Sequence, residues 1–142
     1  MKTKSHLLNK KIKEIFIKHG MSNAHAKISA EAIIKAELFG VPSHGLARVK
    51  MYCDRLKRKL INPKAKIKIK KISNSISHID AKNAIGFVAA DIGIKETIKN
   101  AQKTGIGLVG IKNSGHYGLS RFYAEQAVKK KLIVWFYNND HN

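Results

Sequence analysis

The hydrophobic period of this chain changes once, near Asn62-Pro63, and that change limits the folds open to it. Before this point apolar residues recur at every third or fourth position, which is typical of amphipathic helices. After it, residues 66–70 alternate strictly between lysine and an apolar residue, which indicates a strand with one face in water. The sequence therefore predicts a helical lobe over residues 1–62 and a part with strands over residues 63–142.

Three helices are expected in the first part. The first begins at Ser5 as its cap and ends before Gly20, which can adopt the left-handed conformation of a C-terminal cap. Ser22 opens the second helix, which stops before Pro42. The third is expected over residues 46–59, before the chain is broken by proline.

The second part is expected to alternate strands and helices, in the order strand 66–70, strand 76–80, helix 86–103, buried strand 105–111, helix 119–131 and strand 132–137. This order predicts an α+β fold, with a helical lobe followed by the start of a mixed α/β domain. The last strand is apolar and needs neighbours on both edges, yet only polar residues follow it. We therefore expect a domain that is incomplete at its C-terminal side.

The charge of the chain is strongly positive, but lysine carries most of it. There are 28 Lys+Arg against 9 Asp+Glu, which gives +19 at pH 7, and such an excess is common in proteins that bind nucleic acid. However, 24 of the 28 are lysines, whereas arginine is the side chain that reads phosphates and base edges with a planar fork. A compositional bias explains this pattern better, so specific nucleic-acid binding is not expected.

Cysteine usage and hydropathy exclude several further classes. The single cysteine, Cys53, rules out an internal disulfide and a zinc cluster of thiolates. No apolar run approaches the roughly 18 residues of a membrane span, and no histidine pair has the spacing of metal ligands with a carboxylate partner. We expect a soluble cytoplasmic protein with no membrane segment and no metal site.

One candidate functional segment surrounds His44, in a turn between two predicted helices. Gly45 lets the backbone bend there, which would open the imidazole of His44 to a cleft. Arg48 follows four residues later, and a guanidinium can hold a carboxylate with two hydrogen bonds while an imidazole moves a proton. The alternative is structural, with Ser43 as a helix cap and His44 as an ordinary turn residue.

A second candidate segment contains His116 and lies between a glycine-rich strand and a helix. Ligands bind at the carboxyl ends of strands in α/β sheets, and Gly115 and Gly118 permit turns that expose this histidine. The alternative is a flexible loop with a histidine in solvent.

A third pattern, Gly105-x-Gly107-x-x-Gly110, has the spacing of a dinucleotide-binding fingerprint. It lies before and within a predicted strand, whereas the fingerprint requires a turn from strand to helix. Close backbone packing in a buried strand explains these glycines better.

Together the two histidine segments resemble the malate/L-lactate dehydrogenase family that is unrelated to the Rossmann-type enzymes. That family also contains ureidoglycolate and sulfolactate dehydrogenases and 2,3-diketo-L-gulonate reductase. The resemblance covers essentially the whole chain and depends on Ser-His-Gly-x-x-Arg at residues 43–48, Gly-His-x-Gly at residues 115–118 and the helix that includes residues 122–127. Tyr52, four residues after Arg48, makes the ureidoglycolate and malate branches the most similar.

The resemblance implies oxidation of a 2-hydroxy acid, or reduction of the matching 2-keto acid, with NAD or NADP. His116 would be the catalytic acid/base, a role that some branches give to the residue matching His44. Arg48 would hold the substrate carboxylate, and Ser43, His44 and Tyr52 would add hydrogen bonds to the substrate.

The resemblance also implies an assembly and a cofactor site. Residues 1–62 would form a substrate and dimer lobe, and residues 63–142 the start of a non-Rossmann cofactor-binding domain in a homodimer. The turn at Asn139 and Asp140 would touch the cofactor, although an aspartate is unusual there. Members of this family are longer, so we expect a truncated portion that is inactive alone.

Two other classes of function stay open at this point. One is a basic nucleic-acid-binding module, which would need clustered arginines or aromatic residues among the basic ones. The other is a subunit that docks on a second chain, which would cover the apolar segment 132–137.

Overall fold

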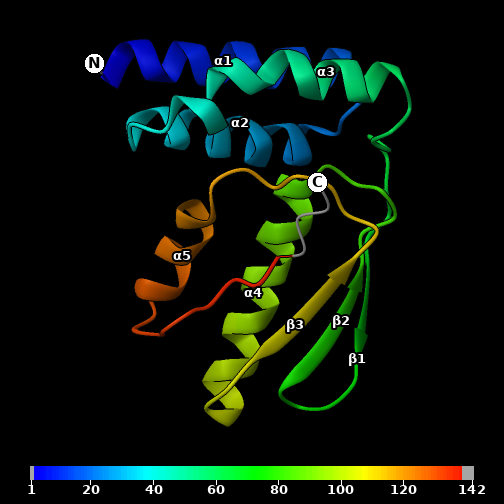
Figure 1. Ribbon diagram of the computed structural model, residues 1–142, viewed down its shortest axis with the longest axis vertical. Helices are drawn as coiled ribbons and strands as arrows, with labels where there is room; N and C mark the ends of the chain where they lie inside the picture. The colour runs from blue at the N-terminus through cyan, green and yellow to red at the C-terminus, as the bar shows by residue number, and fades with distance from the viewer. Residues whose placement is uncertain (1, 139–142) are drawn as a thin grey trace.

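The computed structural model describes residues 2–138 and has the α+β class that the sequence predicts (Figure 1). In chain order the elements are α1 (Lys2–Lys18), α2 (Asn23–Leu38), the 3-10 turns η1 (Pro42–His44) and η2 (Leu46–Arg48), α3 (Val49–Lys57), β1 (Lys68–Lys71), β2 (Ile76–Asp80), α4 (Gly86–Thr104), β3 (Leu108–Lys112) and α5 (Ser120–Val128). The helices α1, α2 and α3 form a layer across one end of the sheet, and α4, α5 and the sheet lie below this layer in the view of Figure 1.

The boundary between α1 and α2 follows the signals in the sequence. Gly20 has a φ of 89°, a left-handed conformation that glycine adopts without steric cost, and α1 ends just before it. Ser22 caps α2, because its hydroxyl accepts a hydrogen bond from the backbone N–H of His25 (3.2 Å). Both predictions are confirmed.

Two other predicted caps are wrong. Ser5 lies inside α1, which already includes Lys2. Ser43 lies in η1, and its hydroxyl bonds to Nδ1 of His44 (3.1 Å) instead of to a helix N-terminus. Short polar side chains have several local partners to choose from, so the residue type alone did not identify the partner.

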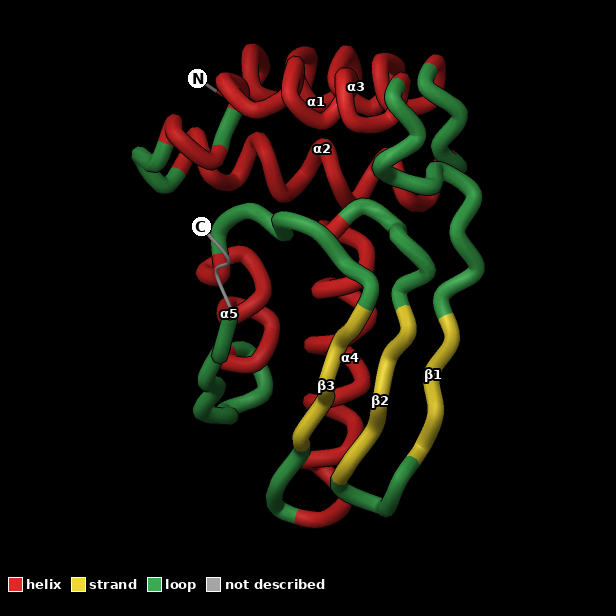
Figure 2. The backbone as a smooth tube through the Cα atoms, turned by 45° about the vertical axis from the view of Figure 1, so that its right-hand side comes forward, coloured by secondary structure: helices red, strands yellow, loops and turns green. Residues whose placement is uncertain are grey.

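The sheet has three strands in the order β1-β2-β3 (Figure 2). β1 and β2 are antiparallel, with Ile69 opposite Ile79, whereas β2 and β3 are parallel, with Ile79 opposite Ile111. Parallel neighbours need a crossover connection, and α4 provides it while packing on both strands. The carboxyl ends of β2 and β3 therefore point the same way, toward the helical layer (Figures 1 and 2).

The main core lies where the helical layer meets the first turn of α4. Phe16, Ile33, Phe87 and Val88 are all 0% exposed and belong to one cluster. Burial of a large apolar side chain stabilises the fold by about 1.5–3 kcal/mol, so this cluster firmly joins the helices to the strand-containing part. The same contact brings the turn after α2 close to the loop after β3.

Both outer strands are less buried than the sequence predicts. β3 is limited to Leu108–Lys112, and Leu108 is 60% exposed, so the predicted buried strand over residues 105–111 is wrong in its burial. All residues of β1 are exposed, so its predicted buried face is wrong as well. The reason is position, because an outer strand of the sheet formed by residues 2–138 is shielded by a neighbour on one side only.

The predicted strand over residues 132–137 is also wrong. Leu132 and Val134 pack partly against the cluster formed by α4 and α5, whereas Ile133, Trp135 and Tyr137 are 92–93% exposed. The apolar alternation is present, but a strand also needs a partner for its backbone N–H and C=O groups. No strand within residues 2–138 pairs with this segment.

Candidate functional site

The loop that carries His116 lies on the first turn of α4. It follows β3 at the carboxyl end of the parallel pair, as the sequence predicts. A side chain on Gly86 would collide with the carbonyl oxygens of Gly115 and His116, so glycine permits this close approach. Gly118 has a φ of 80° and passes against the ring of Phe87, which turns the chain toward α5.

The turn that carries His44 is held by the end of α2. Oε1 of Glu37 accepts a hydrogen bond from the backbone N–H of Leu46 (2.6 Å). A side chain on Gly45 would collide with that carboxylate. The glycine next to His44 is thus explained by the approach of Glu37.

The structure brings the two predicted acid/base candidates together. The ring centroids of His44 and His116 lie 5.4 Å apart, and the planes of the two imidazoles differ by 28°. Both residues are half-buried. His116 is therefore not the solvent-exposed histidine of its structural alternative, whereas His44 does lie in a turn, η1.

Tyr52 joins this pair from α3. Its hydroxyl lies 2.6 Å from Nδ1 of His116, and its ring packs against Phe87 at 4.8 Å between centroids. The residue is only 1% exposed. Burial raises the pKa of the Tyr52 hydroxyl well above its ordinary value, although the positive charges of Arg48 and Arg55 act in the opposite direction.

Arg48 is bonded to the turn that carries His44, so part of its guanidinium is already engaged. Its Nε donates to the carbonyl oxygen of Ser43 (2.7 Å), and its Nη1 lies 3.8 Å from the sulfur of Met51. A guanidinium has five N–H donors, so the contacts within residues 2–138 leave donors for an anion. Ser43 is exposed beside this arginine.

The carboxyl ends of β2 and β3 are joined by Asp80. Its Oδ1 accepts hydrogen bonds from Nδ2 of Asn113 (2.9 Å) and from the backbone N–H of Lys82 (3.1 Å), and its Oδ2 pairs with Nζ of Lys82 (2.8 Å). These bonds, with Lys82 making the largest contribution, hold the pKa of the Asp80 carboxyl well below its usual range. Asp80 therefore anchors the start of the loop that leads to His116.

Two segments of the sequence bear on a cofactor site, residues 139–140 and the glycine pattern at residues 105–110. Asn139 and Asp140 lie outside the described residues. The glycine pattern at residues 105–110 is not a nucleotide cradle, because a side chain on Gly107 would collide with the backbone of α4 at Thr97. Close packing of this glycine is therefore confirmed. Among residues 2–138 no group of three His, Cys, Asp or Glu side chains is arranged to hold a metal ion.

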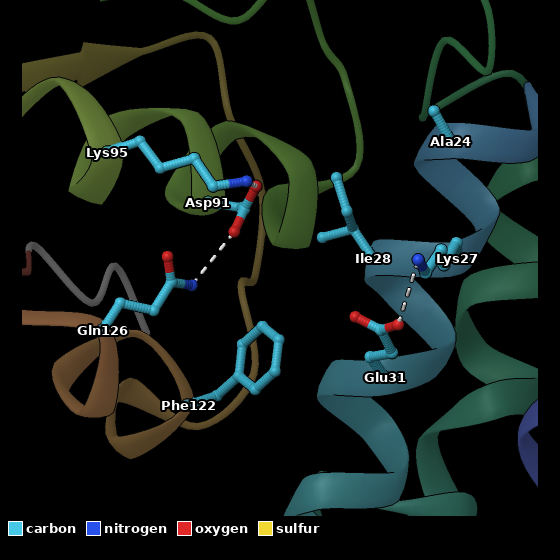
Figure 3. Close-up of a pocket in the computed structure, with 8 residues that line it drawn as sticks. All are labelled: Ala24, Lys27, Ile28, Glu31, Asp91, Lys95, Phe122 and Gln126. Carbon is cyan, nitrogen blue, oxygen red and sulfur yellow. Dashed lines mark hydrogen bonds and ion pairs between the residues drawn. The ribbon is translucent and has the colours of Figure 1, made fainter. Parts of the chain in front are cut away.

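A groove of about 430 Å³ lies elsewhere, between α2, α4 and α5 (Figure 3). Its charged side chains are paired with one another: Asp91 with Lys95 (2.5 Å) and Lys27 with Glu31 (3.9 Å). Gln126 donates a further hydrogen bond to Asp91 (3.0 Å). The lining includes none of the predicted site residues, so this groove is separate from the histidine pair.

Three supporting residues have no predicted role in the sequence. Glu37 lies nine positions before the N–H that it binds, and Gly86 and Phe87 contact the His116 loop from another element. Gly86 begins the predicted helix over residues 86–103, where a glycine is a weak signal of close packing. No nearby residue in the sequence indicates which segment approaches it. These contacts depend on how the elements pack.

A mixed sheet with paired histidines at its carboxyl edge, next to a helical layer, is the arrangement expected of the dehydrogenase family named above. The family model described as malate/L-lactate dehydrogenase matches residues 4–142, and the chain belongs to this family.

In residues 2–138 no helix has both the length and the apolar character needed to cross a bilayer.

Individual relatives agree with this assignment. The chain is 38% identical over 114 residues to the malate/(S)-sulfolactate dehydrogenase of Methanothermus fervidus, covering 80% of this chain and 34% of that protein. It is 31% identical over 133 residues to the ureidoglycolate dehydrogenase (NAD(+)) of Escherichia coli K12, covering 94% and 38%. The solved malate dehydrogenase of Pyrococcus horikoshii OT3 superimposes with a TM-score of 0.86 at 35% identity, covering 89% and 36%.

These relatives are longer than this chain, and the names of relatives include both nicotinamide cofactors. The chain spans 34% to 38% of the length of the two curated relatives described above. The relatives' names specify NAD(+) in some and NADP(+) in others, so both cofactors occur among them. The relatives described here are dehydrogenases, which gives the nucleic-acid interpretation no support.

Proposed function

We propose that this chain supplies the substrate side of an NAD- or NADP-dependent dehydrogenase of 2-hydroxy acids. The observation that carries the proposal is the stacking of His44 on His116 at 5.4 Å, because it unites the histidines of two separate motifs in one place. The names of the relatives supply the chemistry, since they act on malate, sulfolactate or ureidoglycolate.

His116 is the proposed catalytic acid/base. During oxidation it would accept the proton of the substrate hydroxyl. During reduction it would donate a proton to the carbonyl oxygen. Arg48 would bind the substrate carboxylate with its remaining N–H donors, and Ser43 and His44 would add hydrogen bonds at the exposed side. The bound nicotinamide cofactor would supply or accept the hydride, and Asn139 and Asp140 are the residues of this chain that would contact it.

We also propose that residues 1–142 are inactive alone, so the direct test is an assay of the protein as it occurs in its cell, together with whatever protein completes its cofactor-binding side, with malate, lactate, sulfolactate and ureidoglycolate, each with NAD and with NADP. We expect oxidation of at least one of them. In the His116→Ala variant the kcat should fall by roughly 10²–10⁴, as is usual when an acid/base is lost. His6→Ala is the matched control, because His6 is exposed on α1, and it should retain the wild-type rate.

The assay also separates the two histidines. If His44→Ala loses the larger factor and His116→Ala is near wild type, the acid/base role belongs to His44 and the assignment to His116 is wrong. If no 2-hydroxy acid is oxidised and no 2-keto acid is reduced with either cofactor, the proposed function is overturned.

We also propose that the protein works as a homodimer in the cytoplasm, as its family resemblance implies. Light scattering on the purified protein tests the assembly and should give twice the mass of one chain. A single-chain mass at micromolar concentration would contradict the dimer.

A further inference from the structure

One nitrogen of His116 has two hydrogen-bonding neighbours from different parts of the chain. The hydroxyl of Tyr52 lies 2.6 Å from Nδ1, and the backbone N–H of Gly118 points to the same atom at 3.3 Å. A hydroxyl can donate or accept, but a backbone N–H can only donate. The Gly118 amide therefore favours a bare Nδ1 that accepts hydrogen bonds.

This geometry decides where a neutral His116 keeps its proton. A neutral imidazole has one N–H, and the nitrogen that carries it is set by the bond that the other nitrogen makes. With Nδ1 as the acceptor, the hydrogen sits on Nε2, and the Tyr52 hydroxyl donates. Because burial raises the pKa of Tyr52, this hydroxyl keeps its own proton at neutral pH.

We propose that Tyr52 is a positioning residue, which fixes the tautomer and the ring orientation of His116, the proposed acid/base. This inference rests on the proposed function and differs from a substrate-binding role for Tyr52. A side chain that is 1% exposed offers almost no surface to a substrate, whereas its hydroxyl is already bonded to His116.

The Tyr52 hydroxyl also suits both charge states of the imidazole. When His116 is doubly protonated, Nδ1 carries a hydrogen, and the hydroxyl can rotate to accept it. Phe87 packs against the Tyr52 ring at 4.8 Å and holds it in place, so the oxygen stays at Nδ1 through such a change. Tyr52, four residues after Arg48, thus orients the histidine of the second motif, His116.

The test compares Tyr52→Phe with the wild-type protein. Phenylalanine keeps the ring that packs on Phe87 and removes only the hydroxyl. Tyr123→Phe is the matched control: Tyr123 is also fully buried, and its hydroxyl donates to the carbonyl oxygen of Tyr117 (2.6 Å) rather than to a histidine. The readout is the ¹⁵N spectrum of labelled histidine side chains above the pH at which they titrate, with His116→Gln to assign the signals.

We expect wild type and Tyr123→Phe to show His116 with a pyridine-type Nδ1 and a pyrrole-type Nε2. In Tyr52→Phe the two nitrogen signals should move toward each other, because a second tautomer is populated. A mixed tautomer in the wild type, or an unchanged one in Tyr52→Phe, overturns the positioning role. This spectrum does not depend on activity, so it can succeed or fail independently of the proposed function.

Kinetics give a second and separate readout. Loss of a hydrogen bond that orients a functional histidine commonly costs about 10- to 100-fold, and this loss should appear in kcat with little change in KM. A raised KM with an unchanged kcat would instead mean that Tyr52 binds the substrate, and would overturn the proposal.

Discussion

Asp80 is a single carboxylate that holds two strand ends together. It accepts a hydrogen bond from Asn113, at the end of β3, and pairs with Lys82 on its own loop. Because its pKa is lowered in the folded protein, the folded state keeps this carboxylate ionised at a pH where the unfolded chain, with an ordinary pKa of about 3.9, binds a proton. Its contribution to stability is therefore complete at neutral pH and is lost as the pH falls below this ordinary value.

The Asp80→Asn variant should show this dependence. At pH 7 its free energy of unfolding should be lower than that of the wild type, and the difference should shrink as the pH falls from about 5 toward 2. Urea denaturation at a series of pH values measures it. Asp54→Asn is the control, since Asp54 forms one surface pair with Lys50 (2.7 Å) and exposed pairs contribute little. A difference between wild type and Asp80→Asn that is constant with pH would contradict this account.

At the scale of elements, the first turn of α4 is the support for the whole site. Phe87 packs on Tyr52, and Gly86 lies directly under the backbone of Gly115 and His116. The N-terminal end of this helix therefore contacts both the element that carries Tyr52 and the loop that carries His116. A small change in this turn should therefore alter the positions of both Tyr52 and His116.

Two glycines of α4 test this support. Alanine is about 1 kcal/mol better than glycine inside a helix, but a side chain at Gly86 meets backbone atoms that cannot move aside, and overpacking costs about 1–3 kcal/mol. We expect Gly86→Ala to lower stability and dehydrogenase activity. Gly93→Ala should be milder, because its Cβ meets only the flexible end of Ile111 (2.6 Å). Thermal melts that rank the two variants in the reverse order would contradict this.

At the scale of the whole molecule, one face of the sheet is covered by α4 and the other carries exposed apolar side chains. Leu108 and Ile76, which lie opposite each other in β3 and β2, are 60% and 37% exposed. The segment after α5 adds Ile133, Trp135 and Tyr137, all more than nine-tenths exposed. Ile76 and Leu108 are neighbours on adjacent strands, and exposed apolar neighbours of this kind commonly mark an interaction site.

Trp135 reports on the segment after α5, because it is the one tryptophan of the sequence. With 92% of the residue exposed, its fluorescence should peak close to that of free indole in water, and iodide should quench it readily. Emission shifted to the blue, with protection from iodide, would contradict the exposure described here and would show that further protein covers the segment.

Most of the helices and both histidine motifs can be predicted from the sequence alone. The 3.6-residue period gave the helices that became α2 and α4 to within a residue or so, Gly20 and Ser22 marked their boundary, and His44, Arg48 and His116 stood out in their glycine-containing turns. These features depend on residues close together in the chain, and such interactions are encoded in local periodicity and turn chemistry.

How these parts contact one another depends on tertiary packing. The bond from Tyr52 to His116 joins α3 to a loop far along the chain, and the contact of Gly86 with that loop depends on packing of the core. The failed strand over residues 132–137 has the same cause, because alternation describes one strand while pairing needs a second. Hydrogen bonds between distant segments form only once burial of the core has fixed their distance, and no local pattern contains that distance.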